Sequence, residues 1–222
     1  IVAFRIKRLD SAEFGDFALD GRRCEYLRAL GSDLHATASL LHTAWEDSFA
    51  ADLTLAPGTE RYMNIGEAFG EVVNGVAFTV EILRDEKLGR PLGLKSGGEA
   101  QPEAVESRFA ERSIDDALDT LSGVESLLTG RYGDGQAIGL LEVVSRSNLP
   151  RGNALGVQAR ARLDAARESL QAIDTPLDDA VVHDRAAVQH AREVLRELLV
   201  LLQVELTQAL AVTVTFGGAD GD

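Results

Sequence analysis

The stretch from Asp178 to Val212 constrains the fold most, because neither glycine nor proline interrupts it. Apolar residues recur there at alternating spacings of three and four, namely Val188, Ala191, Leu195, Leu198 and Leu202. This spacing places them along one side of an α-helix that can bury against partner helices. A second apolar row beside it consists of Val181, Val194 and Leu201. Together the two rows form a wide apolar stripe, which is typical of helices in bundle cores. We therefore expect one long helix, with Asp178 or Asp179 as its N-cap.

Similar stripes predict further helices over residues 21–50, 60–86, 113–128, 137–144 and 159–173. The first of these has an inward series of Leu27, Leu30, Leu34, Ala38, Leu41, Trp45 and Phe49. Ser113, followed by Asp116 three residues later, predicts a variant of the capping box. Glycine and proline are dense in residues 87–102, which we expect to form a loop. The pattern predicts an all-α fold of two packed bundles, residues 1–95 and 96–222.

The composition restricts the classes of partner. The net charge of −14 repels phosphate backbones, so nucleic-acid binding is not expected. Cys24 is the only cysteine, which excludes an internal disulfide and any multi-cysteine metal site. No run of eighteen apolar residues exists, so the sequence predicts no transmembrane segment. The chain opens at Ile1 as though inside an element, and we expect the first bundle to be incomplete at its N-terminus.

Candidate metal ligands are few. His35 and His42 lie seven residues apart on one predicted helix, and Glu46 follows one turn later. An imidazole and a carboxylate four residues apart can share a metal ion, although a solvated polar flank explains the same pattern. Asp220 and Asp222 can offer oxygen ligands to Ca²⁺, or belong to an acidic tail. The His190–Glu193 pair spells H-x-x-E, but its charged neighbours favour a solvated helix face.

Three stretches, taken in order, carry a family resemblance. The first is RRCEYLRALGSDLHATASLLHTAW, residues 22–45, with its Cys-Glu-Tyr-Leu start and closing tryptophan. The second is DEKLGRPLG, residues 85–93, followed by Val105-Glu106-Ser107, Arg112-Ser113 and Asp116. The third is the ending, with Phe216 and the Asp-Gly-Asp tripeptide. Together these stretches resemble the imelysin family of bacterial envelope proteins.

The resemblance implies two antiparallel helical bundles related by a pseudo-twofold axis, with a ligand cleft between them. It also implies export by a signal peptide to the periplasm, or a lipoprotein anchored to the outer membrane, with a link to iron uptake and its envelope components. A divalent metal or iron is the implied cofactor. The residues that match the family signatures, and that we expect to line the cleft, are Trp45, Lys87, Glu106, Ser107, Arg108 and Ser113.

The chain departs from the family at one motif. Some imelysins are described as metallopeptidases with a G-x-H-x-x-E motif before the first matched helix, where this chain offers only IVAFRIKRL, residues 1–9. If that segment corresponds, Phe4 or Arg5 replaces the histidine and Lys7 or Arg8 replaces the glutamate. A cationic side chain cannot hold a divalent metal. We therefore expect a binding protein; the alternative is a metal-dependent peptidase whose motif lies in a missing N-terminal segment.

Overall fold

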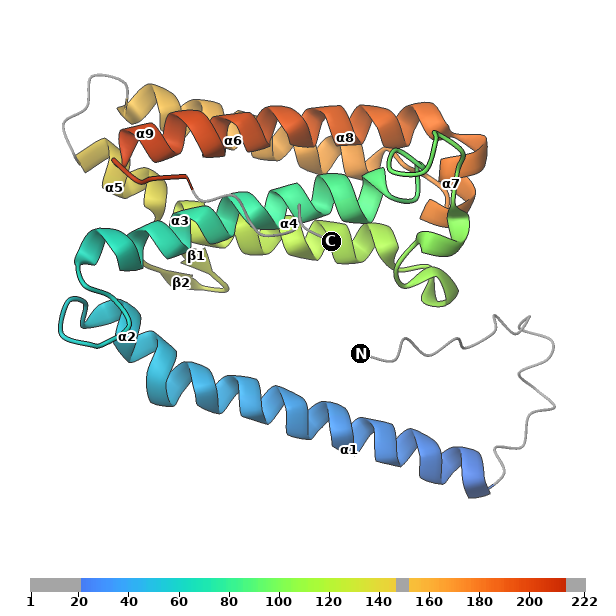
Figure 1. Ribbon diagram of the computed structural model, residues 1–222. Coiled ribbons are helices and arrows are strands. Elements are labelled where there is room, and N and C mark those ends of the chain that lie inside the picture. The colour runs from blue at the N-terminus through green and yellow to red at the C-terminus, as the bar shows by residue number, and fades with distance from the viewer. Residues whose placement is uncertain (1–20, 147–151, 215–222) are drawn as a thin grey trace. The chain divides into compact units, whose positions relative to one another are not determined.

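The computed structural model describes residues 21–146 and 152–214, which are mostly helical (Figure 1). This confirms the predicted all-α class. The chain divides into two compact units between Phe69 and Gly70. The predicted bundles, 1–95 and 96–222, divide the chain at a different place, and their pseudo-twofold relation stays a prediction. Among the described residues, no helix is both long enough and apolar enough to cross a membrane.

Unit 1 contains one long helix, α1 (Gly21–Ala44), which continues through the π-helix η1 (Trp45–Phe49) into the short α2 (Ala50–Thr54). The predicted helix over 21–50 is thus present. Its apolar series is exposed, however, and Leu34 and Leu41 are each 72% accessible. The physical reason is that the described part of unit 1 holds no second long helix against which this stripe can pack.

The helix α3 (Ile65–Ile82) begins five residues later than predicted, because Asn64 and Glu67 define its start. The backbone N–H of Glu67 donates to Asn64 Oδ1 at 3.0 Å. The Glu67 carboxylate in turn accepts from the backbone N–H of Met63 at 2.8 Å. This arrangement resembles a capping box, except that the carboxylate accepts from the residue before Asn64, and it satisfies a donor that the first turn of the helix leaves free. Ile65, predicted to be inward, is 67% exposed at this new start.

Unit 2 contains the remaining elements. After α3 come the π-helix η2 (Leu83–Gly89), the 3₁₀ turns η3 (Pro102–Ala104) and η4 (Arg108–Ala110), and α4 (Ser113–Thr129). A small antiparallel hairpin follows, in which β1 (Arg131–Tyr132) pairs with β2 (Gly135–Gln136). The chain then forms α5 (Leu140–Arg146), α6 (Gly152–Gln171), α7 (Leu177–His183), α8 (Arg185–Val200), the π-helix η5 (Leu201–Leu206) and α9 (Thr207–Ala209).

The core of unit 2 lies among helical rods that run side by side, namely α3 with η2, α4, α6 and α8 (Figure 1). α6 packs against α4, α5 and α8, while η2 packs against both α4 and α8. The predicted inward leucines of α4, α6 and α8 are buried here, and the fully buried ones include Leu121, Leu163, Leu195 and Leu198. Hydrophobic periodicity therefore predicted the core of this unit correctly, since each rod presents one apolar side to its neighbours.

The predicted single helix over 178–212 is wrong, because Asp184 separates α7 from α8. The Asp184 carboxylate accepts a hydrogen bond from the backbone N–H of Ala187 at 3.4 Å, as an N-cap residue does. Helix α7 starts after Pro176, and neither Asp178 nor Asp179 caps it. An aspartate that offers a local capping bond can end one helix and start another without glycine or proline.

The packing predicts unequal effects for two leucines of α4. Leu121 is fully buried and Leu127 is 51% exposed. Leu121→Ala is expected to reduce the free energy of unfolding by about 2–5 kcal/mol, because it removes buried methyl groups and leaves a cavity. Leu127→Ala, the matched control, is expected to change it by less than about 1 kcal/mol. Urea unfolding of both variants measures the difference, and equal losses would contradict this description of the core.

Candidate functional site

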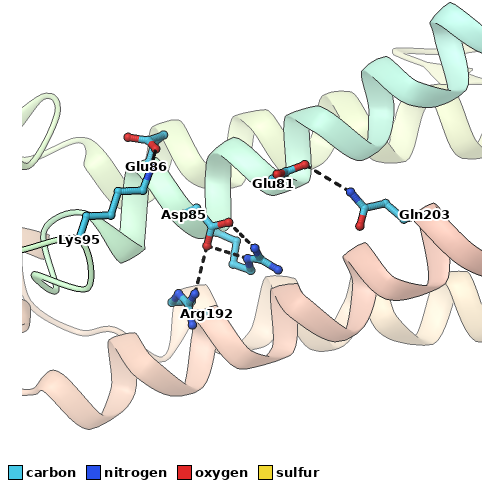
Figure 2. A network of polar contacts seen from close by, with 7 residues as sticks. Glu81, Asp85, Glu86, Lys95, Arg192 and Gln203 are labelled. Atoms are coloured by element: carbon cyan, nitrogen blue, oxygen red, sulfur yellow. Dashed lines mark hydrogen bonds and ion pairs between the residues drawn. The ribbon is translucent and has the colours of Figure 1, made fainter. Parts of the chain in front are cut away.

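The π-helix η2 directs three consecutive charged residues to three different segments of unit 2. Asp85 accepts from Arg192 of α8 at 3.1 Å. Glu86 pairs with Lys95 of the following loop (Figure 2). Lys87 pairs with Glu106 at 2.5 Å. A π-turn contains one residue more than an α-turn, and such turns are frequent at functional sites. Here the wider turn allows neighbouring side chains to diverge, so that η2 connects α8 with the loop before α4.

Asp85 is the central acceptor of this network. It lies between Arg84 and Arg192, and its side chain is 23% exposed. Burial by itself raises the pKa of Asp85, but hydrogen bonds and charge from Arg84 and Arg192 outweigh burial and hold the pKa below its ordinary value of 3.8. The carboxylate therefore stays ionised at neutral pH and joins η2 to α8.

Arg192 requires a glycine beside it. Its Nε is buried without a hydrogen-bond partner, whereas its Nη2 donates to Asp85. A Cβ added at Gly89 would lie 3.3 Å from that Nε. Gly89 thus leaves space for the guanidinium to lie against η2. The sequence pattern assigned Arg192 to a solvated face, and the structure corrects this assignment.

Five of the six residues predicted from the family signatures lie in or beside the loop before α4. Lys87, Glu106, Ser107, Arg108 and Ser113 are called here the signature cluster. Ser107 Oγ donates to Asp116 of α4 at 2.5 Å. Ser113 Oγ donates to the backbone carbonyl of Glu106. Together with the Lys87–Glu106 pair, these bonds fasten the loop to η2 on one side and to α4 on the other.

The signature cluster contains a strained backbone position and a connection to α7. Ser107 has a φ of 48°, a left-handed conformation that costs free energy in residues with a side chain. Arg108 Nε donates to Asp178 at 3.1 Å, and its guanidinium lies 5.7 Å from the centre of the Phe109 ring. Surrounding contacts therefore hold the loop in a shape that its own backbone does not prefer.

The capping role predicted for Ser113 and Asp116 is wrong. Arg112 precedes the first residue of α4, and no side chain caps this helix. Ser113 instead bonds to Glu106, and Asp116 accepts from Ser107. Both residues therefore fix the signature loop rather than the end of the helix. The capping-box spacing predicted that both residues form local hydrogen bonds, but it predicted the wrong partners.

Trp45 lies in unit 1, apart in the chain from the signature cluster. Its side chain is 53% exposed, and its ring lies 5.0 Å from that of Phe49. Its place beside the other predicted residues stays a prediction. Asp85, Asp178 and Arg192 belong to the polar contacts of this region but were not predicted as site residues.

The predicted metal ligands do not form a metal site within the described residues. His42 Nδ1 lies 3.4 Å from Glu46, and both side chains are at least 64% exposed. His35 is exposed on the same helix. Over residues 21–146 and 152–214, no group of three His, Cys, Asp or Glu side chains could hold a metal ion. Two exposed donors are fewer than a divalent metal requires. Asp220 and Asp222 lie outside the described residues.

The H-x-x-E pair of α8 is likewise not arranged for metal binding. Glu193 bonds to Arg196 at 2.7 Å, and both side chains are half exposed. The hydrogen bond from Arg196 lowers the pKa of Glu193 and raises that of Arg196. The Glu193–Arg196 pair is an ordinary surface ion pair of the kind that contributes little to stability.

Comparison with known proteins gives one family and one fold. The family model described as Imelysin matches residues 7–203. A solved structure of an imelysin peptidase from Bacteroides ovatus superposes with a TM-score of 0.72 at 22% identity, covering 84% of this chain. The chain spans about half of that protein, 54% of its length. No match was found among curated proteins.

The Asp85 network predicts a pH-dependent stability. Asp85→Asn is expected to lower the free energy of unfolding at pH 7 by about 1–3 kcal/mol, because Arg84 and Arg192 lose a charged partner. A carboxyl with a lowered folded pKa stabilises the fold above its unfolded pKa, and this contribution is lost as pH falls through the folded value. The gap between wild type and variant should therefore be constant above about pH 5 and shrink below the ordinary pKa.

Urea unfolding at several pH values measures this gap. Asp119→Asn is the control, because Asp119 is 78% exposed and lies 3.8 Å from Arg112. A gap for Asp85→Asn that stays unchanged at pH 3 would show that ionisation of Asp85 does not stabilise unit 2.

Proposed function

The chain belongs to the imelysin family, and from this premise we propose that it is a ligand-binding protein of the bacterial envelope, linked to iron acquisition. The proposed ligand contacts the signature cluster. The proposed location is the periplasm or the outer membrane, which the family resemblance favours. Cell fractionation with an antibody against the protein tests this location, and recovery in the cytoplasm alone would contradict it.

The chemistry of the signature cluster is the observation that carries the proposal. Its hydroxyls donate to a carboxylate and to a backbone carbonyl, and neither is hydrogen-bonded to an imidazole. A serine nucleophile requires an adjacent base that takes its proton. What the cluster offers instead is an ammonium group, a guanidinium group and the carboxylate of Glu106, which is 63% exposed. These groups suit recognition of a polar ligand rather than covalent catalysis.

The Lys87–Glu106 pair is the proposed point of contact. The Lys87 ammonium carries three donors, of which the pair with Glu106 uses one, and its side chain is 24% exposed. An oxygen-rich ligand, such as an iron complex with an organic acid, can accept the remaining donors. The hydrogen bonds of Ser107 to Asp116 and of Ser113 to Glu106 keep this loop in place before the ligand arrives, which reduces the entropy lost on binding.

Ligand binding is expected to raise the melting temperature of the full-length protein, since a ligand that prefers the folded state stabilises it. The screen contains complexed ferric iron, ferrous iron, Ca²⁺, Zn²⁺ and uronate oligomers. Lys87→Met and Glu106→Gln are expected to weaken binding of the stabilising ligand about tenfold or more, because the first removes the ammonium donor and the second removes the carboxylate that positions it. Glu103→Gln, an exposed change in η3, is the control.

Each variant is compared with its own melting temperature in the absence of ligand, so that altered stability is not mistaken for altered affinity. If both Lys87→Met and Glu106→Gln bind the stabilising ligand with unchanged affinity, the ligand does not bind at the signature cluster. No stabilisation by any compound would contradict the binding function itself.

The alternative is a metal-dependent peptidase, and the description of the Bacteroides protein as a peptidase favours it. Its histidine and glutamate would come from outside the described residues. The alternative predicts that the full-length protein cleaves a denatured protein substrate and that a chelator abolishes this cleavage. Chelator-sensitive cleavage that is lost on mutation of a His/Glu pair would replace the binding proposal.

A further inference from the structure

A polar cavity of about 580 Å³ lies in unit 2 at the far end of α4 from the signature cluster. The signature loop adjoins the start of α4 at Ser113, whereas the cavity adjoins its end at Thr129. A helix of 17 residues is about 25 Å long, so the two places are separate. The walls come from α4, the β1–β2 hairpin, α5 and one face of α6. Its volume is in the range of small-molecule sites.

A glycine keeps one wall of this cavity open. Gly156 lies inside α6 and is buried, yet a Cβ added there would meet no atom within 4 Å. Gly152, one turn earlier, differs because an added Cβ would lie 2.8 Å from the carbonyl of Val144. Glycine in a helix interior is less favourable than alanine. Close packing thus explains Gly152, whereas the space beside Gly156 is part of the cavity.

The acidic side chains of the cavity already pair with arginines that do not line it. Glu125 and Asp164 both pair with Arg167, and Glu142 pairs with Arg146 at 2.5 Å. The charge of these three carboxylates is therefore partly compensated by two arginines outside the walls.

Two further arginines line the cavity without a carboxylate partner in the described residues. Arg131 of β1 donates from Nε to Gln136 at 3.3 Å, which leaves its two terminal nitrogens for other acceptors. Arg160 of α6, one turn after Gly156, makes no hydrogen bond or ion pair within the described chain. Both guanidinium groups therefore keep donors for an anionic group of a ligand, although three carboxylates also line the cavity.

We propose that this cavity binds a small organic acid, with a carboxylate held by Arg131 and Arg160. The planar guanidinium group offers parallel donors that match the two oxygens of a carboxylate. The amide of Asn153, which also lines the cavity, can donate to a further oxygen of the ligand. This inference does not depend on the proposed function, because it concerns different residues at the other end of α4.

Thermal shift and titration calorimetry on the full chain test the proposal, with citrate, succinate, acetate and inorganic phosphate at constant ionic strength. At least one carboxylate is expected to raise the melting temperature in a saturable manner. Arg160→Gln is expected to weaken its binding tenfold or more, and Gly156→Leu to abolish it by filling the cavity. Arg196→Gln removes the same charge from an exposed pair on α8 and is expected to bind as wild type does.

Gly156→Ala distinguishes occlusion from damage to the fold. It is expected to raise the melting temperature of the ligand-free protein, because alanine favours the helix, while lowering affinity for the carboxylate. The proposal is overturned if no carboxylate binds, or if Arg160→Gln and Gly156→Ala both bind with wild-type affinity. It is also overturned if Arg196→Gln loses binding equally, which indicates general charge attraction, or if phosphate binds more tightly than every carboxylate.

Discussion

Burial of the apolar sides of four helical rods is the constraint on which unit 2 depends. Val76, Val80 and Leu83 follow helical spacing, but the next fully buried leucine is Leu88, five residues further on. A regular α-helix rotates by 100° per residue, so a step of five cannot stay on one side. The π-turn of η2 absorbs the additional residue and returns Leu88 to the core. The same turn carries Asp85, Glu86 and Lys87, so the packing requirement and the polar contacts have one structural cause.

Much of unit 2 could be predicted from the sequence, because its stripes follow the helical period. The stripes of α4, α6 and α8 are all buried, and their leucines lie in one core. The break at Asp184 was missed because the prediction relied on glycine and proline as helix breakers, whereas a capping carboxylate has the same effect. In α1, periodicity identified the apolar side of the helix. Periodicity gives no information on what covers that side, and Leu34 and Leu41 are exposed.

The sequence predicted a set of site residues but not their contacts, and their role in binding stays a prediction. Lys87, Glu106 and Ser113 were identified through the family signatures and do converge. Their partners Asp178 and Arg192 lie far along the chain, and no local pattern indicates which distant arginine approaches which carboxylate. One local signal was available, since the five-residue step from Leu83 to Leu88 indicates a π-turn. A π-turn predicted at this position would have suggested that Asp85 contacts another helix.

The arginines near the two ends of α4 differ in whether they have a carboxylate partner. In a chain this acidic, an arginine finds a carboxylate easily, and many arginines of the described residues do pair with one. Arg108 and Arg192 hold segments together in this way, so their charge is consumed within the fold. Arg131 and Arg160 differ, because the carboxylates near them are already bound to Arg146 and Arg167. These carboxylates already have a cationic partner, which weakens their attraction for a second one. A carboxylate brought by a ligand has no such partner, and this difference distinguishes Arg131 and Arg160 from the arginines that join segments of unit 2.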